Sequence, residues 1–128
     1  MPSSPLCVLV VEDELLIRWS MTETLAAAGH TVIEAGDAAS ARRVLNGGGV
    51  VNVVFLDLRL PDSNDLTLLA DIRRLAPQSA VVVMTAHGTD EIAARAGQLG
   101  AYAVLDKPFE LHDIEPLMRQ AYLNRPGS

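Results

Sequence analysis

Polar residues that could do chemistry stand at the ends of several apolar stretches of this chain. Asp57 ends the run Val53–Leu56, which is short and rich in β-branched and aromatic residues, as is typical of a strand buried on both faces. Three other runs end in the same way, on Glu12-Asp13, Thr85 and Lys107. Ligands of open α/β sheets bind at the carboxyl ends of the strands, so these positions are candidates for one common site.

The residue types at these positions suit phosphoryl transfer assisted by a metal ion. Carboxylates a few ångströms apart repel one another and raise at least one pKa, unless a cation lies among them. Oxygen ligands of this kind favour Mg²⁺, with Mn²⁺ as an alternative. Asp57 could then act as a nucleophile and form an acyl phosphate. Lys107, the only lysine of the chain, and the Thr85 hydroxyl would meet the charge on the phosphoryl oxygens.

The elements that would bring these residues together alternate along the sequence as strand-like runs and amphipathic segments. The expected strands are Leu6 to Val11, Thr31 to Ala35, Val53 to Asp57, Ala80 to Met84 and Ala101 to Leu105. The expected helices are Glu14 to Ala28, one capped by Asp37 and broken at Gly47, Asn64 to Ala76, Thr89 to Leu99, and a last one near the carboxyl end. Right-handed β-α connections then predict a flavodoxin-like, doubly wound α/β fold with parallel strand order 2-1-3-4-5.

The last helix contains a proline inside its apolar pattern. An interior proline would cost about 3 kcal/mol, whereas a proline in the first turn loses no hydrogen bond. With Asp113 as the N-cap, Pro116 lies in the first turn. We therefore expect one domain over residues 6–123, with residues 1–5 and 124–128 as flexible termini.

Composition excludes several classes of protein. The chain has 128 residues and a formal net charge of −6, which argues against nucleic acid as the main ligand. Cys7 is the only cysteine, so no internal disulfide can form and a buried, reduced thiol is expected. No targeting sequence and no apolar run approaching the ~18 residues of a membrane span is present. These features favour a soluble cytoplasmic protein.

Each of these residues also has a purely structural explanation. Asp13 could cap the first helix, and Thr85 could satisfy a loop. Their joint occurrence at successive strand ends makes coincidence a poor explanation. Other conspicuous side chains are interpreted structurally: Trp19 as partly exposed packing, and His30 and His112 as solvent-exposed histidines without metal-ligand spacing.

Taken together, the motifs resemble the receiver domains of two-component response regulators. The resemblance spans roughly residues 6–121, and two runs, Ile17-Arg18-Trp19 and Met84-Thr85-Ala86-His87-Gly88, are most similar to receivers of the nitrogen-regulation type. The motifs that carry the family resemblance are Val10-Val11-Glu12-Asp13-Glu14, Asp57-Leu58-Arg59-Leu60-Pro61, Met84-Thr85-Ala86-His87 and Asp106-Lys107-Pro108-Phe109.

The resemblance implies a role for each residue of the site. Asp57 would accept phosphate from a phosphohistidine on a sensor histidine kinase or phosphotransfer protein. Asp13 would bind Mg²⁺ directly and Glu12 through water, while the backbone carbonyl of Arg59 would complete the protein ligands. Lys107-Pro108 would be a cis peptide that aims the lysine inward. Arg59 and His87 match positions that tune loss of phosphate in the family.

The resemblance also implies a signalling domain rather than an enzyme. Phosphorylation would draw Thr85 toward the phosphoryl group and change the face formed by helix four, strand five and helix five. Gly88 and Gly97 make helix four a weak helix former, as expected of a moving element. The partner at this face would be a downstream protein or a missing effector domain, without direct nucleic acid or membrane binding. The chain would be a monomer or a phosphorylation-dependent dimer.

Three positions depart from the usual family pattern. Val104 stands where an aromatic switch residue is usual, and Tyr102 lies two positions earlier. Asp65 stands where many relatives have glycine, so the loop after the phosphorylation site must take another conformation. Glu12 replaces the commoner aspartate, a longer side chain that should still reach a metal-bound water.

Several alternatives remain open. A receiver cut from a longer DNA-binding transcriptional regulator is the main one, although the residues after Leu123 are too few for a helix-turn-helix. An aspartyl phosphatase usually has a second acid two residues after the nucleophile, where this chain has Arg59. A flavodoxin-type carrier needs a phosphate-binding loop after strand one, where Glu12-Asp13-Glu14 would repel phosphate. A pseudo-receiver that signals only by docking is disfavoured by the intact acidic cluster.

Overall fold

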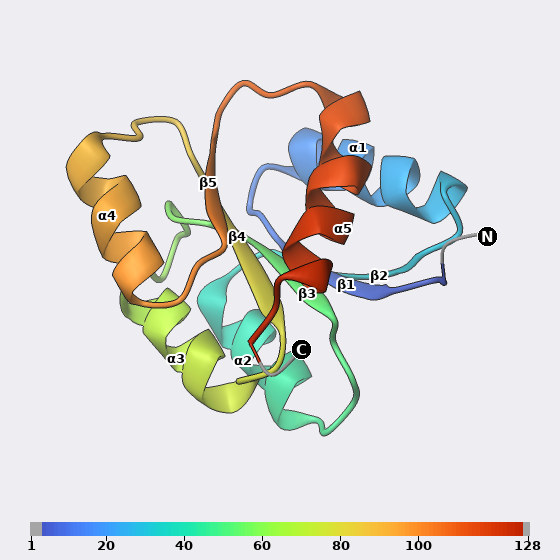
Figure 1. Ribbon diagram of the computed structural model, residues 1–128, viewed down its shortest axis with the longest axis horizontal. Coiled ribbons are helices and arrows are strands. Elements are labelled where there is room, and N and C mark those ends of the chain that lie inside the picture. Colours follow the sequence, from blue (N-terminus) through green and yellow to red (C-terminus); the bar gives the residue numbers. More distant parts are fainter. Residues whose placement is uncertain (1–3, 127–128) are drawn as a thin grey trace.

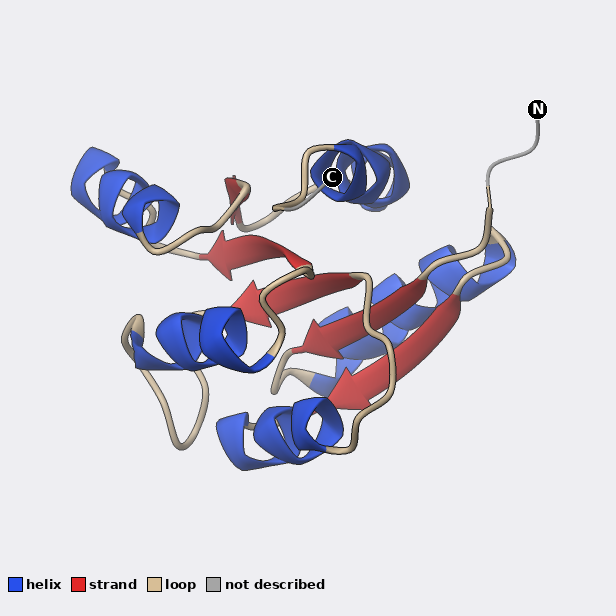
Figure 2. Cartoon of the chain, turned by 60° about the horizontal axis from the view of Figure 1, so that its bottom comes forward, coloured by secondary structure: helices blue, strands red, loops and turns tan. Residues whose placement is uncertain are grey.

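The computed structural model, which describes residues 4–126, contains a five-stranded parallel sheet with helices on both faces (Figures 1 and 2). The strand order β2-β1-β3-β4-β5 confirms the order predicted from the sequence. The parallel pairing of β1 with β3 places Val11 beside Leu56, so Glu12 and Asp57 emerge at the same edge. The strands are β1 Cys7–Val11, β2 Thr31–Ala35, β3 Val53–Asp57, β4 Ala80–Thr85 and β5 Ala103–Asp106.

Helices cover the sheet unequally. Helices α1 and α5 lie on one face, where Met21, Leu25 and Met118 are buried against β1, β3 and β4. Helices α2, α3 and α4 lie on the other face, and α4 buries only Ala96 in that core. The helices are α1 Leu15–Ala27, α2 Ala38–Asn46, α3 Thr67–Leu75, α4 Asp90–Gln98 and α5 Ile114–Leu123, with a 3-10 turn Leu111–Asp113 before α5.

Helix α3 begins later than predicted. The apolar spacing indicated a start at Asn64, but the helix runs Thr67–Leu75. The side chain of Asp65 accepts a hydrogen bond from the Thr67 amide at 2.9 Å, so the first amide of the helix is satisfied by a turn that precedes it. The segment between β3 and α3 is therefore a long loop beside the predicted site.

Helix α5 starts where the position of Pro116 predicts. Asp113 precedes the helix, and Pro116 is its third residue, where a missing amide hydrogen costs nothing. The Asp113 side chain, however, makes no capping hydrogen bond, and its backbone is already helical. The 3-10 turn that leads into α5 explains this difference, because Asp113 belongs to that turn.

His30 is buried, so the expectation of a solvent-exposed histidine is wrong. Its Nδ1 accepts a hydrogen bond from the Leu6 amide at 2.9 Å, and its Nε2 lies 2.7 Å from Glu115 of α5. Since Nδ1 accepts, the proton of the neutral ring is on Nε2 and is donated to Glu115. Glu115 also pairs with Arg119 at 2.7 Å. His112, by contrast, has a side chain that is 78% exposed, as expected.

Other expectations are met in part. Trp19 is 56% exposed, in agreement with partly exposed packing. Cys7 is half-buried rather than fully buried, and burial raises the pKa of its thiol. Asn124 continues the hydrogen bonding of α5, whereas the outermost residues expected to be flexible, 1–3 and 127–128, lie outside the described residues. Within residues 4–126, none of the helices has the length and apolar character needed to cross a membrane.

Candidate functional site

Asp57 is the last residue of β3 and is held from two sides. One carboxylate oxygen, Oδ1, accepts a hydrogen bond from the Arg59 amide at 3.1 Å. The other, Oδ2, lies 3.2 Å from Nζ of Lys107. The side chain is only 5% exposed, because β3 is the central strand and its neighbours β1 and β4 end beside it. Asp57 is therefore a nearly buried carboxylate with a fixed orientation.

Glu12 and Asp13 follow β1 and differ in environment. The Glu12 side chain is completely buried, and it accepts hydrogen bonds from Lys107 at 2.6 Å and from the Glu14 amide at 3.0 Å. Asp13 is exposed. No side chain caps α1, whose N-cap residue is Glu14, so Asp13 does not serve as the helix cap that the structural explanation required.

Lys107 is the cation that pairs with the carboxylates of Glu12 and Asp57. Its Nζ lies between the carboxylates of Glu12 and Asp57, and the Lys107-Pro108 peptide bond is cis, as the family resemblance implied. Burial alone would lower the pKa of Lys107, but the hydrogen bond to Glu12 and the charges of Asp57 and Glu12 outweigh burial and raise that pKa. Lys107 is consequently a permanent positive charge inside the site.

The pKa of Glu12 is raised to about 7. Burial is the main cause, and the neighbouring charge of Asp57 adds to it, while the hydrogen bonds from Lys107 and the Glu14 amide work in the opposite direction. The sequence had suggested repulsion among carboxylates as the cause of a raised pKa. Burial of Glu12 contributes more to its raised pKa than that repulsion does.

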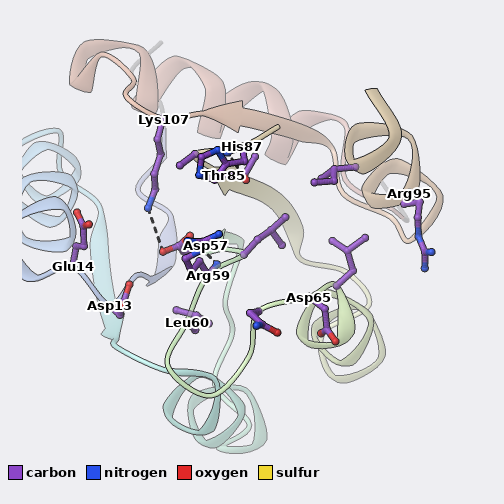
Figure 3. Close-up of a pocket in the computed structure, with 15 residues that line it drawn as sticks. Asp13, Glu14, Asp57, Arg59, Leu60, Asp65, Thr85, His87, Arg95 and Lys107 are labelled. Carbon is purple, nitrogen blue, oxygen red and sulfur yellow. Dashed lines mark hydrogen bonds and ion pairs between the residues drawn. The ribbon is translucent and has the colours of Figure 1, made fainter. Parts of the chain in front are cut away.

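The predicted site residues line a cleft of about 870 Å³ (Figure 3). Asp13, Asp57, Arg59, Thr85 and Lys107 all contribute to its wall, whereas Glu12 lies buried beneath it. Thr85 ends β4 and is 7% exposed; its Oγ1 accepts a hydrogen bond from the His87 amide at 3.2 Å, which leaves the hydroxyl hydrogen free to donate elsewhere. Asp65, Ile92 and Arg95 also line the cleft, and Figure 3 shows Asp65 and Arg95 on the side away from Lys107.

This arrangement matches a known family over most of the chain. The model of the response regulator receiver domain matches residues 8–119. The chain belongs to the response regulator receiver domain family. Its fold and its acidic cleft are those of a signalling domain of two-component systems, as the motifs indicated.

Several similar proteins are regulators of the NtrC and NtrX type. The receiver is 34% identical over 115 residues to the DNA-binding transcriptional regulator NtrC of Azospirillum brasilense, covering 89% of this chain and 24% of that protein. It is 34% identical to the solved receiver domain of NtrX from Brucella abortus, with a TM-score of 0.82 and coverage of 91% of this chain and 98% of that one. PdtaR of Mycobacterium tuberculosis is 33% identical over 120 residues, which are 91% of this chain and 57% of that protein. The receiver thus spans about a quarter of the NtrC relatives.

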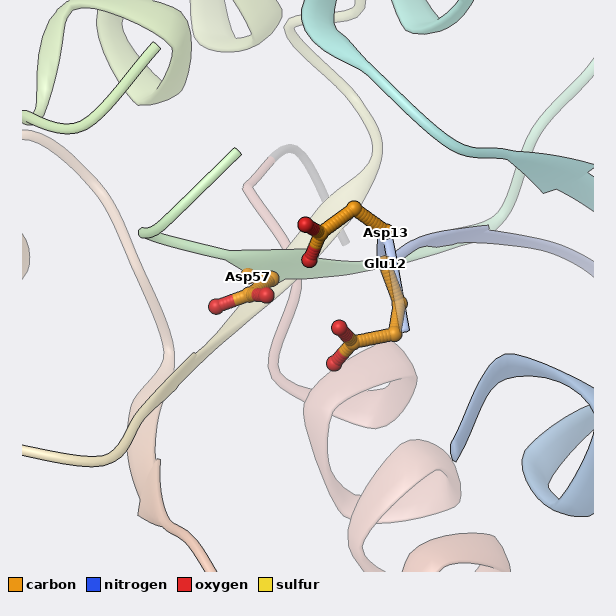
Figure 4. A group of neighbouring side chains, drawn as sticks. All are labelled: Glu12, Asp13 and Asp57. Atoms are coloured by element: carbon orange, nitrogen blue, oxygen red, sulfur yellow. The ribbon is translucent and has the colours of Figure 1, made fainter. Parts of the chain in front are cut away.

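The carboxylates of the receiver fit a divalent cation. Glu12, Asp13 and Asp57 each offer an oxygen, and these oxygens lie within 4.8 Å of one another (Figure 4). A set composed of hard oxygen donors, one of them exposed to the cleft, is the kind that Mg²⁺ prefers, because this ion keeps several water ligands. The donor chemistry of the receiver is therefore consistent with the expected Mg²⁺ or Mn²⁺.

Of the positions expected to form a switch, Thr85 lines the cleft, whereas Val104 and Tyr102 do not. Val104 is half-buried in β5 and packs against the core on the α2–α4 face of the sheet, while Tyr102 is 41% exposed. Among the described residues of β5, none is aromatic. The receiver therefore has an exposed aromatic side chain before β5 and an aliphatic one at the position where the family usually has an aromatic residue.

Two residues that support the receiver's site were missed by the reading of the sequence. Arg18 of α1 donates a hydrogen bond to the carbonyl of Glu12 at 2.9 Å. Asp62, in the loop after β3, accepts two hydrogen bonds from the first amides of α2. Arg18 was noticed only as part of a family motif, and Asp62 follows Pro61, where an acid is an ordinary turn residue. Neither position signals its distant partner in the sequence.

Mg²⁺ binding is expected to weaken as the pH falls below about 7, the pKa of Glu12. Protons and the cation compete for the acidic cluster, so the affinity should drop by up to about tenfold per pH unit below the pKa. The folding stability of the metal-free receiver should change in the opposite direction. A carboxyl whose pKa is raised on folding contributes stability that is present below its unfolded pKa, and this contribution is lost as the pH rises through about 7. Calorimetric titration with Mg²⁺ between about pH 5.5 and 8, on both sides of the Glu12 pKa, measures the change in Mg²⁺ affinity.

Glu12→Gln is the control for this pH dependence. It keeps the size of the side chain but cannot titrate, so the slope of Mg²⁺ affinity against pH near 7 should flatten. An unchanged slope in the variant would assign the titration to another group.

Proposed function

We propose that Asp57 accepts a phosphoryl group from a phosphohistidine of a sensor histidine kinase or phosphotransfer protein, with Mg²⁺ bound by Asp13, Asp57 and the carbonyl of Arg59, and by Glu12 through water. The observation that carries the proposal is the convergence of three acidic side chains and Lys107 at one sheet edge, with only Glu12 sealed from the cleft. Family membership supports the same assignment.

In the proposed transfer, a carboxylate oxygen of Asp57 attacks phosphorus, the phosphorus–nitrogen bond of the donor breaks, and the imidazole leaves with a proton taken up from solvent. The hydrogen bond from the Arg59 amide fixes Oδ1 and thereby orients the carboxylate. Lys107, now shared between Glu12 and Asp57, would neutralise a phosphoryl oxygen, and the Thr85 hydroxyl would donate to another. When bound, Mg²⁺ would supply further charge neutralisation for the acceptor and phosphoryl oxygens.

The proposed output is a change at α4, β5 and α5. Thr85 and α4 are joined by a loop of four residues, Ala86 to Thr89, so movement of the Thr85 side chain toward a phosphoryl group would pull on α4 directly. Because α4 buries only Ala96, little packing opposes its displacement. The receiver spans about a quarter of the DNA-binding NtrC relatives, which favours an effector domain of a longer regulator as the alternative output to a separate partner protein.

An apolar surface beside the site suggests where the phosphodonor protein binds. Leu15, Leu16 and Trp19 of α1 are 70%, 73% and 56% exposed. Leu16 also lines a groove of about 460 Å³ whose other walls include Pro108, Phe109 and Leu111. Glu14, Ala86 and Lys107 border both this groove and the acidic cleft, so a protein that covers the groove would reach Asp57. We assign this surface, the α1 patch, to the phosphohistidine-bearing protein.

Two phosphate donors can separate the chemistry from the docking. Phosphorylation by acetyl phosphate in Mg²⁺, followed by intact mass and by loss of the phosphate in hydroxylamine, tests the proposed chemistry alone. Leu16→Ser should leave that reaction unchanged but slow transfer from a phosphorylated kinase by about tenfold, since one buried apolar anchor commonly contributes this much. Val50→Ser is the matched control, because Val50 is 76% exposed and lies outside the α1 patch.

Each outcome has a distinct meaning. Failure of acetyl phosphate to modify the wild-type chain would contradict the proposed function. Equal slowing of both donors by Leu16→Ser would contradict only the docking surface, because the variant would then affect the site itself.

A further inference from the structure

The loop between β3 and α3 carries an unusual contact with the amino end of α2. Both carboxylate oxygens of Asp62 accept backbone hydrogen bonds, Oδ1 from the Ala38 amide at 2.7 Å and Oδ2 from the Ala39 amide at 3.0 Å. These are the first two residues of α2, whose amides have no partner within the helix. A carboxylate at this position is also favoured by the helix dipole.

The cap of the helix itself is a different residue. Asp37 is the N-cap of α2 and accepts a hydrogen bond from the Ser40 amide at 2.7 Å. The sequence predicted this cap, and with it α2 would have an ordinary amino end. Asp62 satisfies the two remaining amides from a loop 23 and 24 residues away in sequence. Its contact therefore joins two separate parts of the molecule rather than completing a local turn.

The joined loop is the one that leaves Asp57. The Arg59 amide donates to Asp57, the Leu60 side chain is 5% exposed in the core, and Leu60 and Ser63 exchange backbone hydrogen bonds of 2.8 and 3.3 Å across a tight turn. Asp62 lies at the tip of this turn, three residues from Arg59, and is exposed. Apart from these contacts the loop as far as Asp65 is largely open to solvent.

Helix α2, to which the loop is joined, is itself packed against the sheet and paired with α3. Ala38 and Ala41 are fully buried against the sheet, and Arg42 pairs with Asp71 of α3 at 2.8 Å. The hydrogen bond from the Ala38 amide lowers the pKa of Asp62, so its carboxylate stays ionised at neutral pH. The loop is thus held at one end by the sheet and at its tip by a charged, two-oxygen contact with a packed helix.

We propose that Asp62 is a positioning residue for the metal site: by fastening the tip of the loop to α2, it fixes the backbone of Arg59, whose carbonyl is a ligand in the function proposed above. The role of the Arg59 carbonyl as a metal ligand rests on the proposed function. The attachment of the loop to α2 rests only on the hydrogen bonds of Asp62. Partners one step removed from a metal ligand commonly change metal affinity by about tenfold or more when they are removed.

Three variants of the full chain distinguish positioning from a general effect on α2. Asp62→Ala removes both hydrogen bonds to Ala38 and Ala39, and Asp62→Asn keeps an acceptor for one of them. Asp37→Ala is the matched control, because it removes one cap of the same helix and leaves both hydrogen bonds of Asp62 in place. Mg²⁺ affinity is measured by calorimetry, and amide exchange of Arg59 and Leu60 is measured by NMR without metal.

The expected result is a drop in Mg²⁺ affinity of about tenfold in Asp62→Ala, a smaller drop in Asp62→Asn, and wild-type affinity in Asp37→Ala. Exchange of the Arg59 and Leu60 amides should accelerate most in Asp62→Ala, less in Asp62→Asn, and not in Asp37→Ala. Equal affinities, or equal losses in Asp62→Ala and Asp37→Ala, would overturn the proposal, as would unchanged exchange in the loop. A wild-type chain that binds no Mg²⁺ would refute the proposed function and the metal role of Asp62 together. Amide exchange of Arg59 and Leu60 would still show whether Asp62 holds the loop on α2.

Discussion

Asp57→Asn should abolish phosphorylation by acetyl phosphate and by a kinase, to below detection in intact mass. The amide keeps the shape of the side chain and can still accept the hydrogen bond that the Arg59 amide gives to Oδ1 at 3.1 Å. It lacks the negative charge and the nucleophilic oxygen that would form the acyl phosphate. The fold should survive, since Lys107 retains Glu12 as a partner at 2.6 Å.

Asp13→Asn is the informative comparison. Asp13 is exposed at the same cleft, and its loss should weaken Mg²⁺ binding while leaving the acceptor intact, so that high Mg²⁺ restores part of the phosphorylation. Undiminished labelling of Asp57→Asn would move the acceptor role to another carboxylate. Loss of labelling in Asp13→Asn that no Mg²⁺ concentration restores would give Asp13 a part in the chemistry itself.

Lys107→Met should have the second large effect: it should lower the stability and the phosphorylation rate but strengthen Mg²⁺ binding. Without the lysine, the buried Glu12 and Asp57 lose the cation between them, and removing one partner of such a pair costs about 3 kcal/mol of unfolding free energy. Phosphorylation should slow by about a hundredfold or more, because a charge that meets the phosphoryl oxygens is gone. Mg²⁺, in contrast, should bind more tightly, since it no longer competes with the ammonium group for the carboxylates.

Urea unfolding with and without Mg²⁺ measures the changes in stability and in Mg²⁺ binding, and intact mass after reaction with acetyl phosphate measures the change in phosphorylation. The destabilisation should be larger at pH 8 than at pH 6, because Glu12, whose pKa is about 7, is mostly neutral at the lower pH. Arg74→Met is the control: Arg74 is 70% exposed, and its 3.4 Å pair with Asp71 should contribute less than about 1 kcal/mol. Weaker Mg²⁺ binding in Lys107→Met would show that the lysine supports the cation rather than competing with it.

Strand order and the convergence of the acidic residues could be predicted because they follow from local patterns. Short apolar runs fix which segments are strands, and the handedness of β-α connections then leaves few topologies. Parallel strands end at one edge, so residues at successive strand ends must meet there. For this reason Glu12, Asp57 and Lys107 could be grouped without knowing any distance between them.

The parts that could not be predicted depend on partners far away in the sequence. His30 stands at a turn after a helix, where a polar residue normally faces solvent, yet its ring is buried because Leu6 and Glu115 supply both hydrogen bonds. The role of Asp62 could not be predicted for the same reason: an acid after Pro61 is typical of a turn, whereas its partners belong to α2. The start of α3 was misplaced because periodicity in apolar residues does not reveal that Asp65 satisfies the Thr67 amide.

The single lysine has a consequence for the chemical modification of this chain. Acylation of a side-chain amine can occur only at Lys107, and it would remove the positive charge between Glu12 and Asp57. For the same reason the reactivity of that amine toward a labelling reagent measures directly how accessible Lys107 is between its two carboxylate partners, without any engineered probe. In a receiver with several lysines that signal would be spread over the surface, whereas the only lysine of this chain lies between Glu12 and Asp57.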